Sequence, residues 1–254
     1  MMESLDILAA HVPDMRQGRG RIAGVLALAC FALTTAGLLL VDRSWPAWSG
    51  LGQLAAVGLG FVLVSQFFWR RKEFQARWGE RAYRNAFACY VLTGLPVMFA
   101  AIAHNSYLPG TRLLSGWAAW ILVIPSLYFL LTGLALWVRG VLTFGFDNLA
   151  MLYVYFPAEG RLVESSIYAL IRHPVYSAVI RIGLALGLWR GTWFSIAFGL
   201  FMPLGLSIWL RLVEEPELIE RFGEGYAKYR RSTPAFWLPP WDARKFLRFL
   251  VIGK

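Results

Sequence analysis

Six apolar runs of 15 to 22 residues divide this chain, and they constrain its fold more than any other feature. They are residues 22–41, 50–69, 86–103, 117–138, 175–189 and 192–210. A helix of about 20 apolar residues crosses the hydrocarbon core of a bilayer. The fifth run has only 15 residues. We expect it to start earlier, to tilt, or to form a tight hairpin with the sixth run across Arg190 and Gly191.

The composition agrees with a membrane protein, because 58% of the residues are hydrophobic and only 16% are charged. Soluble domains carry about 25% charged residues. We predict an all-α fold, a polytopic integral membrane bundle of about six transmembrane helices with a cytoplasmic C-terminal segment. Residues 1–138 would form an N-terminal segment and a four-helix membrane portion. Residues 139–254 would form a second portion with a helical hairpin and a cytoplasmic tail.

The distribution of charge predicts the orientation of the chain. The net charge is +10, and 21 of the lysines and arginines lie on the side that holds both predicted termini. The opposite loops hold three, Arg43, Arg112 and Arg190. Positive charge collects on the cytoplasmic side, so we place both termini there, in a bacterial inner membrane or the endoplasmic reticulum. Topology and anionic headgroups account for the excess charge, and no nucleic-acid partner is needed.

Metal and phosphate sites are not indicated. Cys30 and Cys89 lie in apolar runs, which is typical of buried thiols. The three histidines, His11, His104 and His173, are far apart and none has a second ligand at metal-binding spacing. The sequence contains no glycine-rich phosphate loop.

Two polar blocks next to the fifth and sixth runs are the candidates for chemistry. Pro174 can occupy the first turn of a helix, which needs no N–H at that point. Tyr176, Ser177 and Arg181 would then lie on or near the same face as His173. In the second block Arg211, Glu214 and Glu215 are three and four residues apart, so we expect them to share a face. Pro216 should end the sixth span or start a new helix.

The two blocks together resemble the isoprenylcysteine carboxyl methyltransferase family, which is related to the membrane phospholipid methyltransferases. The first block reads Tyr168-x3-Arg172-His173-Pro174-x-Tyr176. About 40 residues later the second reads Arg211-x-x-Glu214-Glu215-x-x-Leu218-x3-Phe222-Gly223-x-x-Tyr226-x-x-Tyr229. The resemblance covers roughly residues 140–240. Ser166 and Ala178 stand where the family commonly has glycine, and Pro216 also departs from its pattern.

The resemblance implies an integral membrane methyltransferase that depends on S-adenosylmethionine and methylates a hydrophobic, membrane-embedded acceptor. The acceptor could be a prenyl-cysteine or lipid carboxylate, a lipid amine or a thiol. The cofactor pocket implied in this way consists of Tyr168, Arg172, His173, Tyr176, Glu214, Glu215, Tyr226 and Tyr229. We expect the catalytic set to be Arg211, Glu215 and Arg181, and we expect no metal. Residues 139–254 would be the methyltransferase-like portion.

The residue types suit this chemistry. A sulfonium donor is already activated, so the reaction needs a positioned acceptor more than a strong acid or base. Aromatic rings attract a cationic sulfonium. A carboxylate accepts hydrogen bonds from ribose hydroxyls or from the ammonium group of the donor. Arg172 or His173 can meet the carboxylate of the donor.

Two other functions remain open from the sequence. Membrane sterol reductases that use a nicotinamide cofactor share a similar C-terminal pattern, but they usually carry asparagine where this chain has Val175. A transporter or scaffold could use Arg181 to bind an anion, although no inverted repeat supports transport. Binding of the methyl donor, of a nicotinamide, or of neither separates the three functions.

Arg181 is the polar residue that the family pattern does not explain. A charge inside a membrane span usually faces a partner or a cavity, and the same span contains no acidic residue. One hypothesis is that Arg181 holds a carboxylate or phosphate of a lipidic acceptor. The alternative is that its side chain reaches an interface because the short helix is displaced.

Overall fold

The computed structural model describes residues 2–12, 19–238 and 242–252, and the regular elements in these ranges are helices. The α-helices are α1 (Met2–His11), α2 (Arg19–Ser44), α3 (Ser49–Trp69), α4 (Arg71–Trp78), α5 (Ala82–Ala86), α6 (Leu92–His104), α7 (Trp120–Phe144), α8 (Phe146–Leu149), α9 (Pro174–Arg190), α10 (Trp193–Trp209), α11 (Glu215–Phe222), α12 (Glu224–Ser232) and α13 (Ala243–Ile252). The prediction of an all-α membrane bundle is confirmed.

Within the part of the chain that the structure describes, five helical stretches are long and apolar enough to cross a membrane, and they account for five of the six predicted runs. They are Gly20–Ser44, Pro46–Trp69, Arg71–His104, Gly116–Phe144 and Trp193–Phe222. The fifth run forms α9, which begins one residue earlier than predicted and has 17 residues. It turns into α10 at Gly191, whose φ of +70° suits glycine. The predicted tight hairpin is therefore present.

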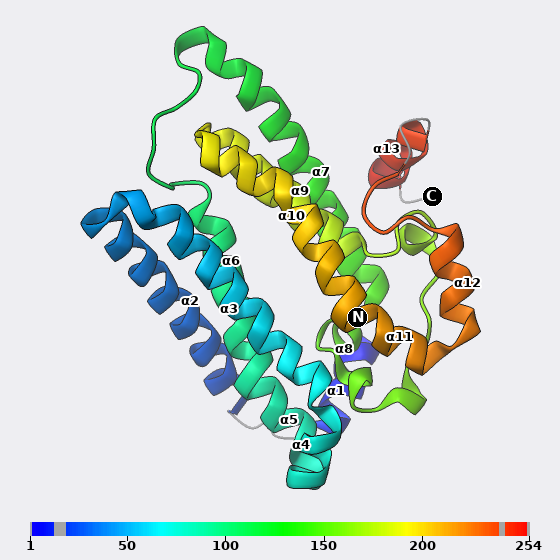
Figure 1. The fold of residues 1–254 in the computed structure, drawn as a ribbon. Helices are drawn as coiled ribbons and strands as arrows, with labels where there is room; N and C mark the ends of the chain where they lie inside the picture. Colours follow the sequence, from blue (N-terminus) through cyan, green and yellow to red (C-terminus); the bar gives the residue numbers. More distant parts are fainter. Residues whose placement is uncertain (1, 13–18, 239–241, 253–254) are drawn as a thin grey trace.

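The membrane helices form two groups of three, with α2, α3 and α6 in one group and α7, α9 and α10 in the other (Figure 1). Small residues allow close packing within each group. A Cβ on Gly133 of α7 would lie 3.1 Å from the Cβ of Arg181 on α9. A Cβ on Gly199 of α10 would lie 2.7 Å from the Cα of Leu184 on α9. Such glycines let helices approach closely where lipid provides no hydrophobic driving force.

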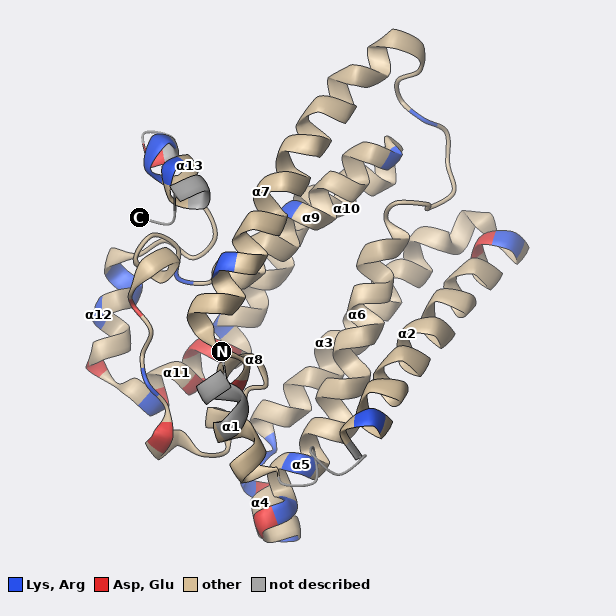
Figure 2. Cartoon of the chain, turned by 180° about the vertical axis from the view of Figure 1, so that it is seen from behind, with Lys and Arg blue, Asp and Glu red and all other residues tan. Residues whose placement is uncertain are grey.

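Charged residues gather at one end of the bundle. Figure 2 shows most lysines and arginines around α4, α11 and α12, and only isolated ones at the opposite end. Helix α1 lies at the same end as α11 and α12 (Figure 1). This distribution follows the uneven loop charges of the sequence. The cytoplasmic assignment of that end remains a prediction from the charge rule.

Cysteine labelling in intact cells tests this orientation. In a background without Cys30 and Cys89, we expect Arg77→Cys and Lys228→Cys to react only with reagents that reach the cytoplasm. Ala47→Cys, in the turn between α2 and α3, should react with an impermeant reagent from the outer side. All three positions are exposed, so a lack of access would reflect sidedness. Labelling of Lys228→Cys from outside would reverse the orientation.

Candidate active site

The first polar block lies at the start of α9, where Pro174 is the first helical residue, as predicted. The backbone N–H groups of Arg172 and His173 donate to the carbonyls of Pro234 and Ala235 at 2.8 and 3.0 Å. One turn later, the Ser177 hydroxyl donates to the carbonyl of Phe236 at 2.7 Å. Residues 234–236 therefore lie along the start of α9 and close one side of the site.

The second block enters the site through a π-helical turn, Leu210–Glu214, between α10 and α11. Helix α11 begins at Glu215, and Pro216 is its second residue. This agrees with the prediction that Pro216 ends the sixth span or starts a new helix. Because proline has no N–H, it cannot donate to the carbonyl of Leu212 four residues earlier. The indole N–H of Trp69 on α3 donates to this carbonyl at 3.3 Å. This contact stabilises the break at the point where the carboxylates enter the site.

The π-helical turn also explains why Arg211 does not join the cluster. A π-helix holds more residues per turn than an α-helix, so a face deduced from α-helical spacing changes across it. Glu215 is buried, whereas the side chain of Arg211 is exposed. The structure brings Glu214 and Glu215 to the first block and leaves Arg211 outside it. Among the described residues, no hydrogen bond or ion pair joins Arg211 to the cluster, so its catalytic role stays a prediction.

Glu215 is held by two arginines. Its Oε1 atom lies 2.8 Å from Nη2 of Arg172, and its Oε2 atom lies 3.1 Å from Nε of Arg230. The hydroxyl of Tyr226 donates to Oε1 at 3.4 Å. Arg172 also donates to the backbone carbonyls of Arg230 and Thr233. Glu215 is only 3% exposed, and its ion pairs link the start of α9 to α12.

Glu214 has different partners. The hydroxyl of Tyr176 donates to its Oε2 atom. The indole N–H of Trp209 donates to the same oxygen at 3.3 Å. Among the residues that the structure describes, no lysine or arginine forms an ion pair with Glu214. Its negative charge is therefore stabilised by neutral hydrogen-bond donors and by His173, and not by a permanent cation.

His173 lies between the two carboxylates. Its Nδ1 atom is 3.6 Å from Oε1 of Glu214, and its Nε2 atom is 3.8 Å from Oε1 of Glu215. Burial lowers the pKa of His173, but the interactions with Glu214 and then Glu215 outweigh burial, so its pKa is raised above the usual 6.5. Its ring stacks on Tyr176 with the centroids 5.7 Å apart. The imidazole therefore favours its protonated, cationic form.

Tyr168 and Tyr229 form an outer layer. The hydroxyl of Tyr229 donates to the backbone carbonyl of Tyr168 at 2.5 Å, and the ring of Tyr168 stacks on Phe144. Tyr229 also lies edge-to-face against Tyr226, with ring centroids 6.1 Å apart. These two tyrosines position the loop before α9, and among the described residues neither hydroxyl forms a hydrogen bond with Glu214 or Glu215. Of the predicted cofactor residues, they are the two that support the cluster from outside.

Ser166 shows why glycine is common at its position in the family that the sequence resembles. Its φ is +59°, a left-handed conformation that costs a residue with a Cβ about 1–2 kcal/mol. Ala178, at the second such position, is fully buried, and its carbonyl oxygen would lie 3.3 Å from a Cβ on Gly133. Both positions therefore restrict side-chain size, one through backbone conformation and the other through helix packing.

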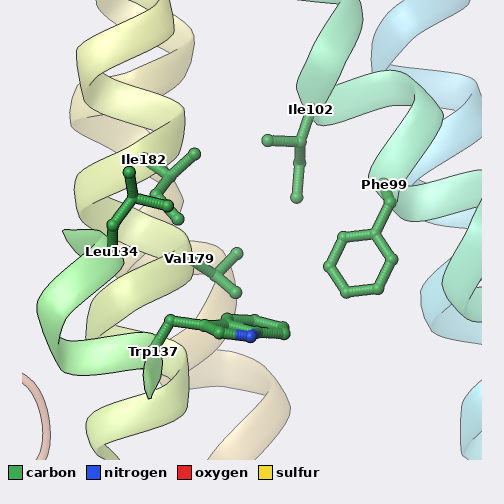
Figure 3. Close-up of a pocket in the computed structure, with 6 residues that line it drawn as sticks. All are labelled: Phe99, Ile102, Leu134, Trp137, Val179 and Ile182. Carbon is green, nitrogen blue, oxygen red and sulfur yellow. The ribbon is translucent and has the colours of Figure 1, made fainter. Parts of the chain in front are cut away.

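An apolar groove opens between the two helix groups (Figure 3). It has a volume of about 350 Å³. Its walls come from α6, α7 and α9, and the residues that line it are Phe99, Ile102, Leu134, Trp137, Val179 and Ile182. Val179 lies one helical turn after Tyr176, so one end of the groove is close to the polar cluster. A groove with these walls suits hydrocarbon.

Sequence reasoning missed several members of the site. Trp209, Arg230 and the backbone of residues 234–236 contact the predicted residues directly. Arg230 directly follows Tyr229, the last residue of the second block, so its position in the sequence indicated that it lies near the site. The hydrogen bonds to the backbone of residues 234–236 do not depend on residue type, so the sequence does not indicate them. Within the described ranges, no group of three or more His, Cys, Asp or Glu side chains is arranged to hold a metal ion.

The family described as phospholipid methyltransferase matches residues 121–225. The matched segment runs from α7 into α12 and contains His173, Glu214 and Glu215. No curated protein and no solved structure matches the chain. The family match confirms the resemblance that the two sequence blocks indicated.

Proposed function

We propose that this chain, whose residues 121–225 match the phospholipid methyltransferase family, is an integral membrane enzyme that methylates a hydrophobic acceptor with S-adenosylmethionine. The observation that carries the proposal is the cluster around Glu214. The partly buried carboxylate of Glu214, which forms no ion pair with any described arginine, lies beside His173, Tyr176 and Trp209 within the matched segment. Such a site places a carboxylate without a lysine or arginine partner among aromatic rings, which suits a cationic ligand.

The cluster also suits the other charged groups of the methyl donor, its ammonium and its carboxylate. S-adenosylmethionine, when bound, supplies a methyl group on a sulfonium cation, which needs no further activation. Glu214 can face this cation or the ammonium group, and the rings of Tyr176 and Phe236 both contact the ring of His173. Arg172 keeps a buried Nε–H that has no hydrogen-bond partner among the described residues. That group can donate to the carboxylate of the donor.

The protein residues divide their work between charge and position. Glu215 forms ion pairs with both Arg172 and Arg230 and so positions both guanidinium groups. Tyr176 and Trp209 fix Glu214. His173 holds its proton between the two carboxylates, which limits their mutual repulsion. The site thereby supplies orientation and a fixed electrostatic environment, which are the main requirements for methyl transfer from a sulfonium.

The groove gives the acceptor an apolar place beside the cluster. Its lining is hydrocarbon and aromatic, and Val179 is three residues from Tyr176 along α9. The tail of a lipidic or prenylated acceptor in this groove would bring its head group toward Tyr176 and Glu214. This placement is compatible with a carboxylate, an amine or a thiol as the methylated group.

Calorimetry on the detergent-purified protein tests the proposal. We expect S-adenosylmethionine to bind and NADPH not to bind. Glu214→Gln should weaken donor binding about tenfold or more, because about 1.4 kcal/mol of lost charge attraction is a factor of ten. Glu224→Gln is the matched control, since that carboxylate is exposed and forms an ion pair with the exposed Arg231.

Transfer of a labelled methyl group to extracted membrane lipids would then identify the acceptor class. Binding of NADPH in place of the methyl donor would favour the reductase reading. A folded protein that binds neither ligand would overturn the proposal.

A further inference from the structure

Arg181 is a buried cation at the centre of the membrane bundle. Its side chain belongs to α9 and the residue is 5% exposed. Its Nη1 atom lies 3.5 Å from the hydroxyl of Thr132, which is the central residue of α7. A charge at the centre of a span is disfavoured by roughly 2.5–3.5 kcal/mol on insertion scales. We therefore expect the guanidinium of Arg181 to have an anionic or hydrogen-bonding partner.

Among the described residues, the partners of Arg181 leave part of its hydrogen-bonding capacity unused. A guanidinium has five N–H donors. Thr132 accepts one long hydrogen bond and the hydroxyl of Tyr128 also interacts with the group, while the Nε–H is buried without an acceptor. Within the described residues, no carboxylate forms an ion pair with Arg181. A buried arginine in this condition is suited to an oxyanion supplied by a ligand.

Two aromatic rings cover the guanidinium instead. Its central carbon lies 4.4 Å from the ring centre of Trp237 and 4.9 Å from that of Phe246. Phe246 belongs to α13, which lies alongside the middle of α7 (Figure 1). Cation–π contacts of this kind stabilise a desolvated cation. They satisfy its charge without using its N–H groups.

The exposed charges of helix α13 favour a different position for this helix in a bilayer. It buries Phe246 and Phe249 against the bundle, but Arg244, Lys245 and Arg248 are exposed. Beside the centre of α7 these cations would face hydrocarbon, which is unfavourable for each of them. A basic amphipathic helix is more stable in the headgroup region, where anionic lipids attract it. Its departure would uncover Arg181.

We propose that Arg181 is a binding site for the phosphate or carboxylate of an anionic membrane lipid, and that Trp237 and Phe246 cover the site until α13 moves to the membrane surface. The site lies on a different side of α9 from the apolar groove, because Val179 and Arg181 are two residues apart on a helix. The proposal extends beyond methyl transfer and does not require it.

The site is also connected to the methyl-transfer cluster. Trp237 directly follows residues 234–236, whose carbonyls accept hydrogen bonds from Arg172, His173 and Ser177. Movement of Trp237 away from Arg181 would therefore pull on the segment that closes one side of the cluster. An anionic lipid bound at Arg181 could in this way change the access of ligands to His173.

Native mass spectrometry of the full chain in detergent tests the site. The probes are dioleoyl phosphatidic acid, oleate, dioleoylglycerol as the neutral lipid with the same chains, and inorganic phosphate. We expect the two anionic lipids to bind, and Arg181→Met to weaken their binding about 10- to 100-fold, the factor for a lost charge-assisted hydrogen bond. Arg77→Met removes an exposed charge and should change nothing.

Equal retention of phosphatidic acid by Arg181→Met and the unchanged protein would overturn the proposal. Equal binding of dioleoylglycerol would show that hydrocarbon alone is recognised, and displacement of the lipids by equimolar inorganic phosphate would assign the site to a free anion. Arg181→Lys keeps the charge and provides a second variant if Arg181→Met fails to fold. We expect it to bind the lipids more weakly than arginine and more tightly than methionine.

The cover is tested by two matched variants of α13. Phe246 contacts the guanidinium, whereas Phe249 is buried on the same helix and packs in the cluster around Leu136. Phe246→Ala should tighten phosphatidic acid binding about threefold or more, because the open state becomes more populated. Phe249→Ala should tighten it less. Equal effects, or none, would overturn the covering role.

Binding of S-adenosylmethionine is measured on each variant as an independent readout. We expect Arg181→Met to keep it. If neither the variants nor the unchanged chain bound S-adenosylmethionine, this result would count against the proposed methyltransferase and not against the anion site.

Discussion

Glu215→Gln should lower the free energy of unfolding of the detergent-purified protein by about 3–5 kcal/mol, the usual cost of removing one partner from a buried ion pair. The side chains of Arg172 and Glu215 are 10% and 4% exposed. Without the carboxylate, Arg172 would stay buried with its charge uncompensated, and Arg230 would lose its contact with the site. The same change should weaken binding of S-adenosylmethionine, because Arg172 and His173 would lose their fixed positions.

Glu224→Gln is the control for this experiment. It makes the same chemical change in an ion pair whose carboxylate is 80% exposed, and exposed pairs contribute less than about 1 kcal/mol. Equilibrium unfolding in mixed micelles, followed by tryptophan fluorescence, measures both variants. If Glu215→Gln unfolded with the same free energy as Glu224→Gln, the buried network would have no special role in holding the site.

His173→Gln should remove a pH-dependent part of the stability. In the folded chain the two carboxylates raise the pKa of His173 above 6.5 despite its burial. A raised folded-state pKa means that the folded protein binds the proton more tightly than the unfolded chain. The resulting stabilisation is complete below about pH 6.5 and disappears as the pH rises through the folded-state pKa.

We therefore expect the original protein to lose stability across that window, and His173→Gln to show a flatter profile. Unfolding free energies measured from about pH 6 to about pH 9 provide the comparison. His11→Gln serves as the control, because the pKa of His11 is also raised but its partner Glu159 is half-exposed. Identical profiles for His173→Gln and the original chain would mean that His173 does not hold a proton between Glu214 and Glu215.

The site residues were predictable to the extent that they belong to two local blocks. Pro174 at the start of α9 and Pro216 at the start of α11 follow from the geometry of proline. The proximity of Arg172 to Glu215, 43 residues apart, came from the family resemblance and not from spacing. Arg211 shows the limit of spacing, because the π-helical turn altered the helical face that its separation from Glu214 suggested.

The sequence alone determined the helices and the membrane. A chain segment in hydrocarbon must satisfy all its backbone hydrogen bonds internally, so an apolar run of sufficient length has no other structure available. Turn chemistry determined the α9–α10 hairpin in the same local way, through Gly191.

Only the tertiary structure decided which charges meet and which stay alone. Arg172 and Arg230 reach Glu215, Glu214 is left to neutral donors, and Arg181 is covered by Trp237 and Phe246. These outcomes depend on the relative rotation and depth of helices that are distant in the chain. Such quantities arise from side-chain packing between elements, and no local pattern in the sequence encodes them.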